Sequence, residues 1–246
     1  MRIIRIYQAS PLSVDKTLLL EETTWRHVCQ VLRLKVGDAF ILFNGDGHDY
    51  HAQLTQVDKR HAKALITDKK IKHHESPLLI HLGQGISRSD RMDYAIQKSV
   101  ELGVNEITPL LTDYSEAYST ERLTKRQQHW QQIAISACEQ SGRAVIPVVH
   151  TPIPLAIWVT NLTSDHLKLI LSPRANAMNN TLTCPTQRLT MAIGPEGGFS
   201  DDEILDAQQE GFDAIALGPR ILRTETATSA AITVAQWLWG DFNRQE

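Results

Sequence analysis

The feature that most constrains the fold is a change of hydrophobic period near residue 77, after which short apolar runs alternate with longer amphipathic stretches. Leu78–Leu82 and Glu106–Leu111 have the length of buried strands, and residues 120–140 carry apolar side chains at helical spacing. Strands that alternate with helices predict an α/β domain with a mainly parallel sheet. Further strands are expected at Leu167–Leu171, Leu189–Ile193 and Ala214–Leu217, and further helices at Asp90–Leu102, Leu155–Val159, Asp201–Gln209 and Thr226–Trp239, with Ser89, Thr120 and Ser200 as N-caps.

The first 72 residues follow a different pattern, in which short strands are separated by tight turns. Asn44-Gly45-Asp46-Gly47 is a strong hairpin signal, because both dipeptides tolerate positive φ. Such a pattern predicts a small β-barrel over residues 1–72, joined by the polar linker Lys70–Pro77 to the domain of residues 73–246. The expected barrel elements are strands at Arg2–Tyr7, Ala39–Phe43, Asp49–Val57 and Ala62–Thr67 and a helix at Thr24–Leu34.

The charge is divided unevenly, with a net +4 over residues 1–72 and −7 over the rest. A basic module attached to an acidic one favours a polyanion as partner of the first, although an ordinary fluctuation accounts for four charges equally simply. The longest apolar runs fall far short of the ~20 residues of a membrane helix. No leader-like apolar segment is visible at the N-terminus, so we expect a cytoplasmic protein without membrane contact. Three scattered cysteines and a solvated His73-His74 pair predict no metal site.

Three predicted strand ends carry loops rich in Gly or Pro: Ser172–Ala175, Gly194–Ser200 and Gly218–Ala227. Ligands bind at the carboxyl ends of strands in α/β sheets, where Gly permits close approach of the backbone and Pro stiffens the loop. One such loop is explained by a tight turn, but three on successive strands favour a ligand site. A phosphate-binding P-loop is absent, and Arg88 stands where a GxGxxG motif needs its third Gly.

The motifs IGPEGGFS (193–200) and LGPRILRTETA (217–227), followed by an Ala-rich helix, resemble the RsmE family of bacterial ribosomal RNA methyltransferases in the SPOUT superfamily. The stretches RLKVGD (33–38), QKSVELGV (97–104) and EQSGR (139–143) are similar to that family too, so the resemblance spans essentially the whole chain.

This resemblance implies an N-terminal PUA-like RNA-binding β-barrel over 1–72 and a SPOUT-type α/β domain over 73–246 with a C-terminal trefoil knot. It also implies a homodimer that uses S-adenosylmethionine, without a metal, to methylate N3 of a uridine in the 16S ribosomal RNA of the small ribosomal subunit. The residues that match the family's cofactor loops are Leu171, Ser172, Pro173, Ile193, Gly194, Pro195, Glu196, Gly197, Leu217, Gly218, Arg220, Ile221 and Leu222.

The chemistry requires a group that accepts the uracil N3 proton or stabilises the resulting anion. Glu225, Glu196 and Glu139 are the acids in the matching motifs, and the choice of base among them stays open. Glu225 is also explained as an acid at a helix N-terminus, or as the partner of Arg223. The candidate catalytic residues in the matching motifs are Glu225, Arg223, Glu139 and Arg143. In the barrel, Arg5, His27 and Arg33 are expected near RNA, with the net charge of +4 in support, and Arg88 is a further candidate for contact with the uracil or a phosphate.

Two other functions compete with this interpretation. An RNA-binding ribosome-assembly protein would keep the fold without catalysis, but the intact loop motifs argue against it. An enzyme for another adenine nucleotide would use the same pocket, but the missing P-loop argues against that. Trp237 and Trp239 in the last helix predict a subunit interface there, because aromatic side chains are enriched at interfaces.

Overall fold

The computed structural model of the chain describes residues 4–116, 118–175, 182–184 and 186–243. The chain divides into two compact units, one formed by residues 1–75 with 138–146 and the other by residues 76–137 with 147–246. The division after residue 75 lies inside the predicted linker, slightly beyond the boundary expected after residue 72. The sequence did not predict that residues 138–146 return to the first unit.

Residues 138–146 join the first unit through hydrogen bonds to its first strand. Arg5 donates from Nη1 to the carbonyl oxygen of Cys138 at 2.8 Å and from Nη2 to that of Arg143 at 3.1 Å. The backbone N–H of Tyr7 donates to Glu139 Oε1 at 2.9 Å. These partners are 132 to 138 positions apart in the chain, so no local pattern could indicate their contact.

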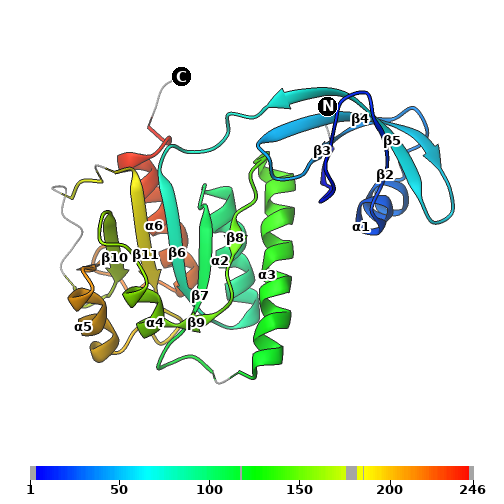
Figure 1. Ribbon diagram of the computed structural model, residues 1–246. Helices are drawn as coiled ribbons and strands as arrows, with labels where there is room; N and C mark the ends of the chain where they lie inside the picture. Colours follow the sequence, from blue (N-terminus) through cyan, green and yellow to red (C-terminus); the bar gives the residue numbers. More distant parts are fainter. Residues whose placement is uncertain (1–3, 117, 176–181, 185, 244–246) are drawn as a thin grey trace. The chain divides into compact units, whose positions relative to one another are not determined.

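The sheet of the first unit has five strands in the order β1-β3-β4-β5-β2 (Figure 1). Only β1 and β3 are parallel. Phe40, Leu42 and Tyr50 are buried in its core, and the predicted hairpin has positive φ at Gly45 and Gly47. The sequence missed β2. The strands are β1 Arg5–Tyr7, β2 Thr17–Leu19, β3 Ala39–Phe43, β4 His48–Val57 and β5 Ala62–Ile71.

The helix predicted at Thr24–Leu34 is confirmed only in part. A short α1, Glu22–Trp25, continues as a π-helix, η1, over Arg26–Val31. The apolar spacing still places Trp25 and Val28 in the core. Nothing in the sequence distinguishes a π-helix, which is wound more widely, from an α-helix.

The second unit contains a seven-stranded sheet in which every pair is parallel, as the sequence predicted. The order is β12-β10-β11-β6-β7-β8, and β9 also pairs with β7. The two-residue strands β8 and β9 were not predicted, because they are too short to show a period. The strands are β6 Leu79–Gly85, β7 Glu106–Leu111, β8 Val148–Val149, β9 Ile153–Pro154, β10 Leu167–Leu171, β11 Arg188–Ile193 and β12 Asp213–Ile215.

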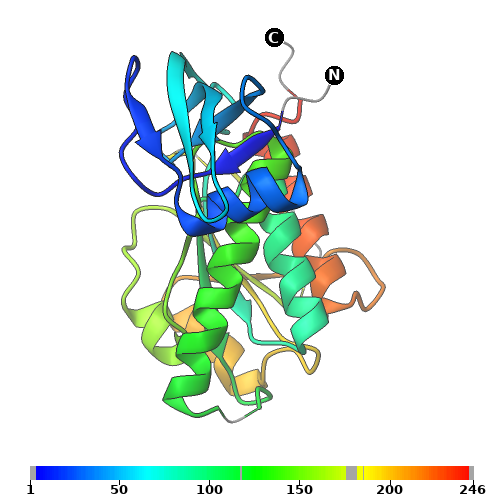
Figure 2. The same cartoon turned by 90° about the vertical axis from the view of Figure 1, so that its right-hand side faces the viewer.

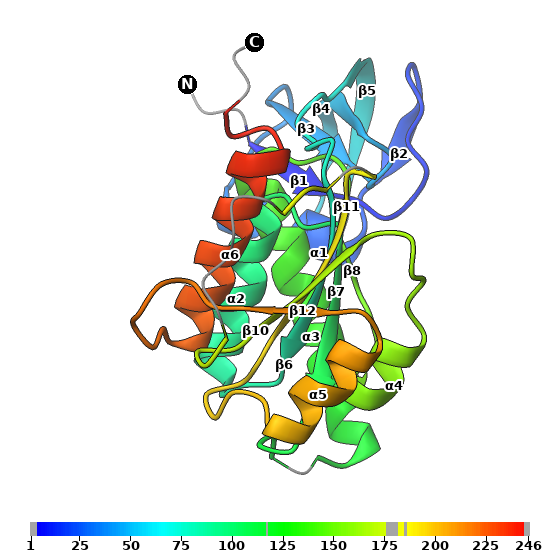
Figure 3. The same ribbon diagram turned by 90° about the vertical axis from the view of Figure 1, so that its left-hand side faces the viewer.

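Helices cover both faces of this sheet. Figure 3 shows α2 and α6 packed together on one face and α4 and α5 on the other. Figure 2 shows α3 beside α2, where His129 of α3 lies 2.9 Å from Asp93 of α2. No helix in the described part of the chain is long and apolar enough to cross a membrane. The helices are α2 Ser89–Glu101, α3 Thr120–Ser141, α4 Leu155–Thr160, α5 Asp201–Gln209 and α6 Thr224–Trp239.

One of the three predicted N-caps is confirmed. Ser200 caps α5 with a complete capping box, in which Ser200 Oγ accepts from the Glu203 N–H and Glu203 accepts from the Ser200 N–H. Ser89 and Thr120 are instead the first residues inside their helices. The Ser89 hydroxyl accepts a hydrogen bond from Arg126 Nη2, so tertiary packing uses this side chain in another way.

Candidate active site

A cavity of about 650 Å³ lies at the carboxyl ends of β10, β11 and β12 in the second unit. Its wall consists mainly of the three loops that follow these strands, each of which contains Pro and two of which also contain Gly, as the topology rule for α/β sheets predicts. Every residue that the sequence assigned to the cofactor lines it: Leu171, Ser172, Pro173, Ile193, Gly194, Pro195, Glu196, Gly197, Leu217, Gly218, Arg220, Ile221 and Leu222.

The glycines of these loops serve different purposes. A Cβ on Gly194 would lie 2.8 Å from the carbonyl carbon of Gly198, and one on Gly197 would lie 2.9 Å from Tyr114 Cβ. Both glycines therefore allow the protein to pack against itself. A Cβ on Gly218 would lie 3.9 Å from Arg220 Nη2, an ordinary contact, but the φ of +77° is one that L side chains rarely adopt. Gly218 is thus required by the turn.

A buried network of hydrogen bonds connects β6, the β11 loop and the start of α6. Gln84, fully buried at the end of β6, donates from Nε2 to Thr224 Oγ1 at 3.0 Å and accepts from Thr228 Oγ1 at 2.6 Å. Thr224 Oγ1 in turn donates to the Gly194 carbonyl at 2.7 Å. The network fixes α6 against the loop that lines the cavity.

Two of the acids in the cavity wall already have cationic partners. Glu196 Oε1 accepts from the backbone N–H of Arg88 at 3.1 Å and lies 3.3 Å from Arg91 Nη1. Asp201 pairs with Arg174 at 2.8 Å. These contacts make Glu196 a poorer candidate for a free base than the sequence indicated.

Arg220 and Arg223 are the exposed cations of the wall that form no salt bridge within the described residues. The pairing of Arg223 with Glu225 that the sequence left open is not present in this structure. Both guanidinium groups are therefore available for an anionic ligand.

Glu225 lies beside the cavity without lining it, while its neighbours Thr224 and Ala227 do line it. Its Oε2 atom is buried and has no hydrogen-bond partner among the described residues. A buried carboxylate oxygen without a hydrogen-bond partner lowers the stability of the folded state, so its presence indicates a role other than stabilisation. This makes Glu225 the acid that stands out next to the cavity.

Glu139 and Arg143, also predicted to be catalytic, belong to the first unit and are absent from the cavity wall. Burial raises the pKa of Glu139, whose Oε1 accepts from Tyr7. Arg143 is 3% exposed and forms a bidentate ion pair with Glu75, with Nε at 3.1 Å from Oε2. The structure therefore gives both side chains partners that hold the end of α3 in the first unit.

The four residues predicted to contact RNA differ in burial. Arg5 is a poorer candidate than the sequence indicated, because its side chain is 8% exposed, pairs with Asp49 at 2.7 Å and stacks on Phe43. His27 is half-buried, whereas Arg33 is exposed, with a φ of 56°. Arg88 is exposed in the second unit as the residue that precedes α2.

The sequence missed several residues of the cavity wall. Arg91 comes from α2 and gave no signal, because its loop partner Glu196 is far away in the chain. Arg174, Phe199 and Thr224 belong to the motif loops but were not singled out. The other additional wall residues are Gly198, Asp201, Ile204, Ile215, Ala216 and Ala227, besides the predicted catalytic residue Arg223.

Comparison with known families gives two matches that together cover both units. Residues 74–236 match an RNA methyltransferase domain, and residues 20–67 match an RNA methyltransferase PUA domain. The chain is thus a mixed α/β protein with a PUA-like N-terminal domain and a parallel-sheet methyltransferase domain.

Individual relatives agree with these domains. The ribosomal RNA small subunit methyltransferase E of Buchnera aphidicola subsp. Schizaphis graminum is 40% identical, over 98% of this chain and 99% of the relative. The structure of the enzyme of that name from Neisseria gonorrhoeae, bound to S-adenosyl methionine, superposes with a TM-score of 0.93, at 41% identity over 98% of this chain and 100% of that one. A Legionella pneumophila protein solved with the bound cofactor SAM gives 0.92, at 40% identity over the same shares.

Proposed function

The chain belongs to the RNA methyltransferase family that includes the ribosomal RNA small subunit methyltransferases E, and we propose that it methylates N3 of a uridine in 16S ribosomal RNA. The observation that supports this most strongly is the cavity formed by the three motif loops at the carboxyl ends of β10, β11 and β12. The family membership makes the chain an S-adenosylmethionine-dependent ribosomal RNA methyltransferase. The position on the base is the finer part of the proposal.

The residues of the cavity fit S-adenosylmethionine. A volume of about 650 Å³ lies within the range of about 300–1,000 Å³ typical of small-molecule sites. Leu217, Ile221 and Leu222 offer apolar surface for an adenine ring, and Gly218 has no side chain to obstruct it. No hydrogen bond within the described residues uses the backbone of Gly218, Ile221 or Leu222, so these groups are available to the base edge. When bound, the cofactor supplies an electrophilic methyl group on its sulfonium.

The protein's own part in the reaction is to orient the uracil and to manage the N3 proton. Glu225, whose Oε2 has no partner, accepts that proton. Arg223 and Arg220 stabilise the negative charge on the uracil oxygens or hold the neighbouring phosphate. Glu139 and Arg143 act indirectly, by holding the end of α3 in the first unit.

RNA binding falls mainly to the first unit. Its match to a PUA domain and the net charge of +4 over residues 1–72 support this assignment. Arg33, just beyond the end of η1, is exposed for a phosphate contact, and half-buried His27 lies within η1. Arg5 supports the unit from inside, through its ion pair with Asp49. Arg88 is the RNA-contact candidate of the second unit.

The assembled form that we propose is a cytoplasmic homodimer. Trp237 and Leu238 on α6 are 58% and 44% exposed, and apolar side chains of this size favour an interface over water. We also propose that the strands of the first unit close into a barrel and that the last part of the chain, after the segment from Gly218 to Arg223, is threaded through a loop to form a trefoil knot. The position of this segment between edge strand β12 and α6, which packs on α2, is compatible with such a path.

Calorimetric titration and nucleotide mapping test this function together. Wild-type protein should bind S-adenosylmethionine and S-adenosylhomocysteine but not ATP, and should produce N3-methyluridine in small-subunit RNA from a strain that lacks the enzyme. Binding of ATP alone would favour another adenine-nucleotide enzyme. RNA binding without cofactor binding would favour an assembly protein that lacks catalysis.

A further inference from the structure

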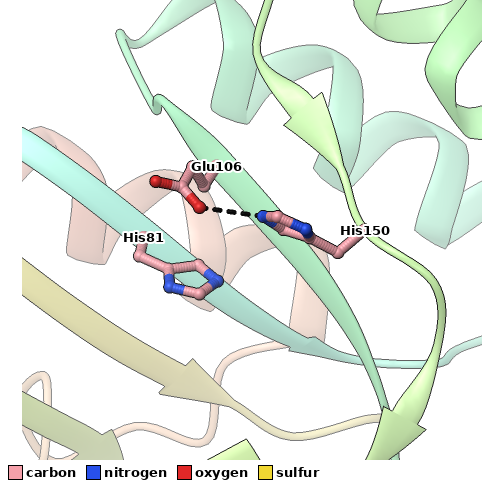
Figure 4. A group of neighbouring side chains, drawn as sticks. All are labelled: His81, Glu106 and His150. Atoms are coloured by element: carbon pink, nitrogen blue, oxygen red, sulfur yellow. Dashed lines mark hydrogen bonds and ion pairs between the residues drawn. The ribbon is translucent and has the colours of Figure 1, made fainter. Parts of the chain in front are cut away.

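Three side chains with metal-binding atoms lie together at the opposite end of the second unit's sheet. His81 is on β6, Glu106 begins β7, and His150 directly follows β8 (Figure 4). Parallel pairing brings them together, since His81 is in register with Glu106, and Glu106 with Val148. One nitrogen of each imidazole and one carboxylate oxygen all lie within 4.8 Å of one another.

The surrounding sheet holds the His81 side chain, whereas the Glu106 and His150 side chains pair with each other. His150 Nε2 lies 2.8 Å from Glu106 Oε2, and the backbone N–H of His150 donates to the Ile107 carbonyl. His81 Nε2 lies 2.8 Å from Thr108 Oγ1, and the His81 ring packs edge-on against Trp158 at 5.3 Å. The two imidazole rings are 5.6 Å apart. Thr108 and the buried Trp158 position His81, and the ion pair brings Glu106 and His150 together, so part of the conformational freedom of the three side chains is already lost before a ligand binds.

The cluster is separate from the active site. None of its residues lines the cavity. The cavity opens at the carboxyl ends of the strands, whereas Glu106 is the first residue of β7, and His81 lies in the amino-terminal half of β6. A ligand here would therefore affect the stability of the sheet and not the methyl transfer.

We propose that His81, Glu106 and His150 form a binding site for a divalent transition-metal ion, with Zn²⁺ as its best fit. Two imidazoles and one carboxylate are a known zinc ligand set, with water completing the tetrahedron. Their donor atoms would bind at about 2.0–2.2 Å, so the cluster, whose donor atoms lie within 4.8 Å of one another, would contract around the ion. Mg²⁺ and Ca²⁺ prefer oxygen ligands, so they fit this set poorly. The ion would join β6, β7 and the segment after β8.

Two measurements on the full-length, chelator-treated protein test the site. Calorimetric titration with Zn²⁺ should give one strong site per chain, and Co²⁺ should give the visible absorption of a tetrahedral ion. Saturation with Zn²⁺ should raise the thermal unfolding temperature, because an ion that binds only the folded state stabilises it. Absence of both the Zn²⁺ heat and the Co²⁺ absorption would overturn the proposal.

Matched variants distinguish this site from the other histidines of the chain. Glu106→Gln and His150→Gln should weaken Zn²⁺ binding at least about tenfold and remove the Co²⁺ absorption. His129→Gln is the control, because it breaks a similar pair, with Asp93 at 2.9 Å, that belongs to no three-residue group within the described residues. The double variant His73→Gln and His74→Gln tests whether the two histidines of the linker contribute to Zn²⁺ binding.

Either loss or retention of Zn²⁺ binding in these variants decides whether the site exists. Glu106 is exposed, and its amide variant keeps the shape of the side chain, so loss of binding there would not reflect misfolding. Undiminished Zn²⁺ binding in Glu106→Gln and His150→Gln, or an equal loss in His129→Gln, would overturn the proposal. Calorimetry with S-adenosylmethionine on the same samples shows separately whether the proposed cofactor function holds.

Discussion

The two ends of the second unit's sheet are built in different ways. At the carboxyl end, the cavity wall comes mainly from three continuous loops, each a few residues long and each marked by Pro. At the amino end, His81 and Glu106 come from β6 and β7 and His150 from the residue after β8, and the three meet only through register. A continuous loop carries its chemistry in neighbouring residues, whereas a cross-strand cluster leaves no mark in the sequence around any of its members.

This contrast separates two physical roles. Loops at the carboxyl end can close on a cofactor, because their glycines permit turns and their backbone groups are not committed to the sheet. Side chains on the strands are held by the pairing itself, which suits a fixed ligand set. We therefore expect substitutions at the carboxyl end to affect binding and turnover, and substitutions at the amino end to affect stability.

Among the substitutions considered for the carboxyl end, Gly218→Val should reduce cofactor binding most. Its φ of +77° is strained for a β-branched residue, so the loop must move and cofactor binding should become undetectable by calorimetry. Gly211→Val is the matched control, because Gly211 has a φ of +86° and open space but is outside the cavity wall. The control should lose stability and keep its cofactor affinity. Normal cofactor binding by Gly218→Val would remove this loop from the site.

Glu225→Gln should separate chemistry from binding in the same region. The amide keeps the shape of the side chain but is not a base, so single-turnover methylation should fall by about 10²–10⁴-fold with cofactor affinity unchanged. A loss below about tenfold would mean that solvent or another group takes the proton.

Glu139→Gln is the natural comparison for Glu225→Gln. Its amide oxygen still accepts from Tyr7, so methylation should stay within about twofold of wild type. Burial raises the pKa of Glu139 in the folded state, so its ionisation opposes folding once the pH exceeds the unfolded value. Relative to wild type, the variant should therefore gain stability as the pH rises from 4 to 8, as thermal unfolding would show. A large loss of turnover would restore Glu139 to the catalytic residues.

Trp237→Ala should weaken the proposed dimer by roughly tenfold or more, because it removes the more exposed of the two aromatic side chains on α6. Trp239 is less exposed than Trp237, being half-buried in its own subunit, so Trp239→Ala should weaken the dimer less. Ile157→Ala, at a 51% exposed apolar position on α4, is the control. Sedimentation velocity at several concentrations measures the change, and an unchanged dimer in both tryptophan variants would exclude this face.

Removal of metal should have the smallest effect on activity. The amino-end cluster lies apart from the cavity, so Glu106→Gln should methylate RNA within about twofold of wild type, with or without chelator. Its unfolding temperature should no longer respond to Zn²⁺. A large loss of turnover would mean that the two ends of the sheet are coupled.

Much of the fold could be predicted from local pattern. The alternation of strands and helices that indicated a parallel sheet, the hairpin at Gly45 and Gly47 and the Ser200 cap all depend on residues close together in the chain. So do the three loops that supply most of the cavity wall, since each strand end and its loop form one continuous segment. The order of the strands was not predicted, because it joins distant residues such as Ile80 and Leu189. The very short strands β2, β8 and β9 and the π-helical η1 were missed, because a few residues show no period and helical spacing does not reveal the width of the winding.

Tertiary packing decided what happens to side chains whose partners lie far along the chain. An arginine in a basic segment looks like a surface cation, yet Arg5 is buried between Asp49, Phe43 and carbonyl groups of residues 138 and 143. The same applies to Arg143 with Glu75, and to His81 with Glu106 and His150. Strand register and burial decide whether a charged group meets solvent, a partner or a ligand. Both arise only when distant segments pack, so the sequence around a residue shows its chemistry but not its neighbours.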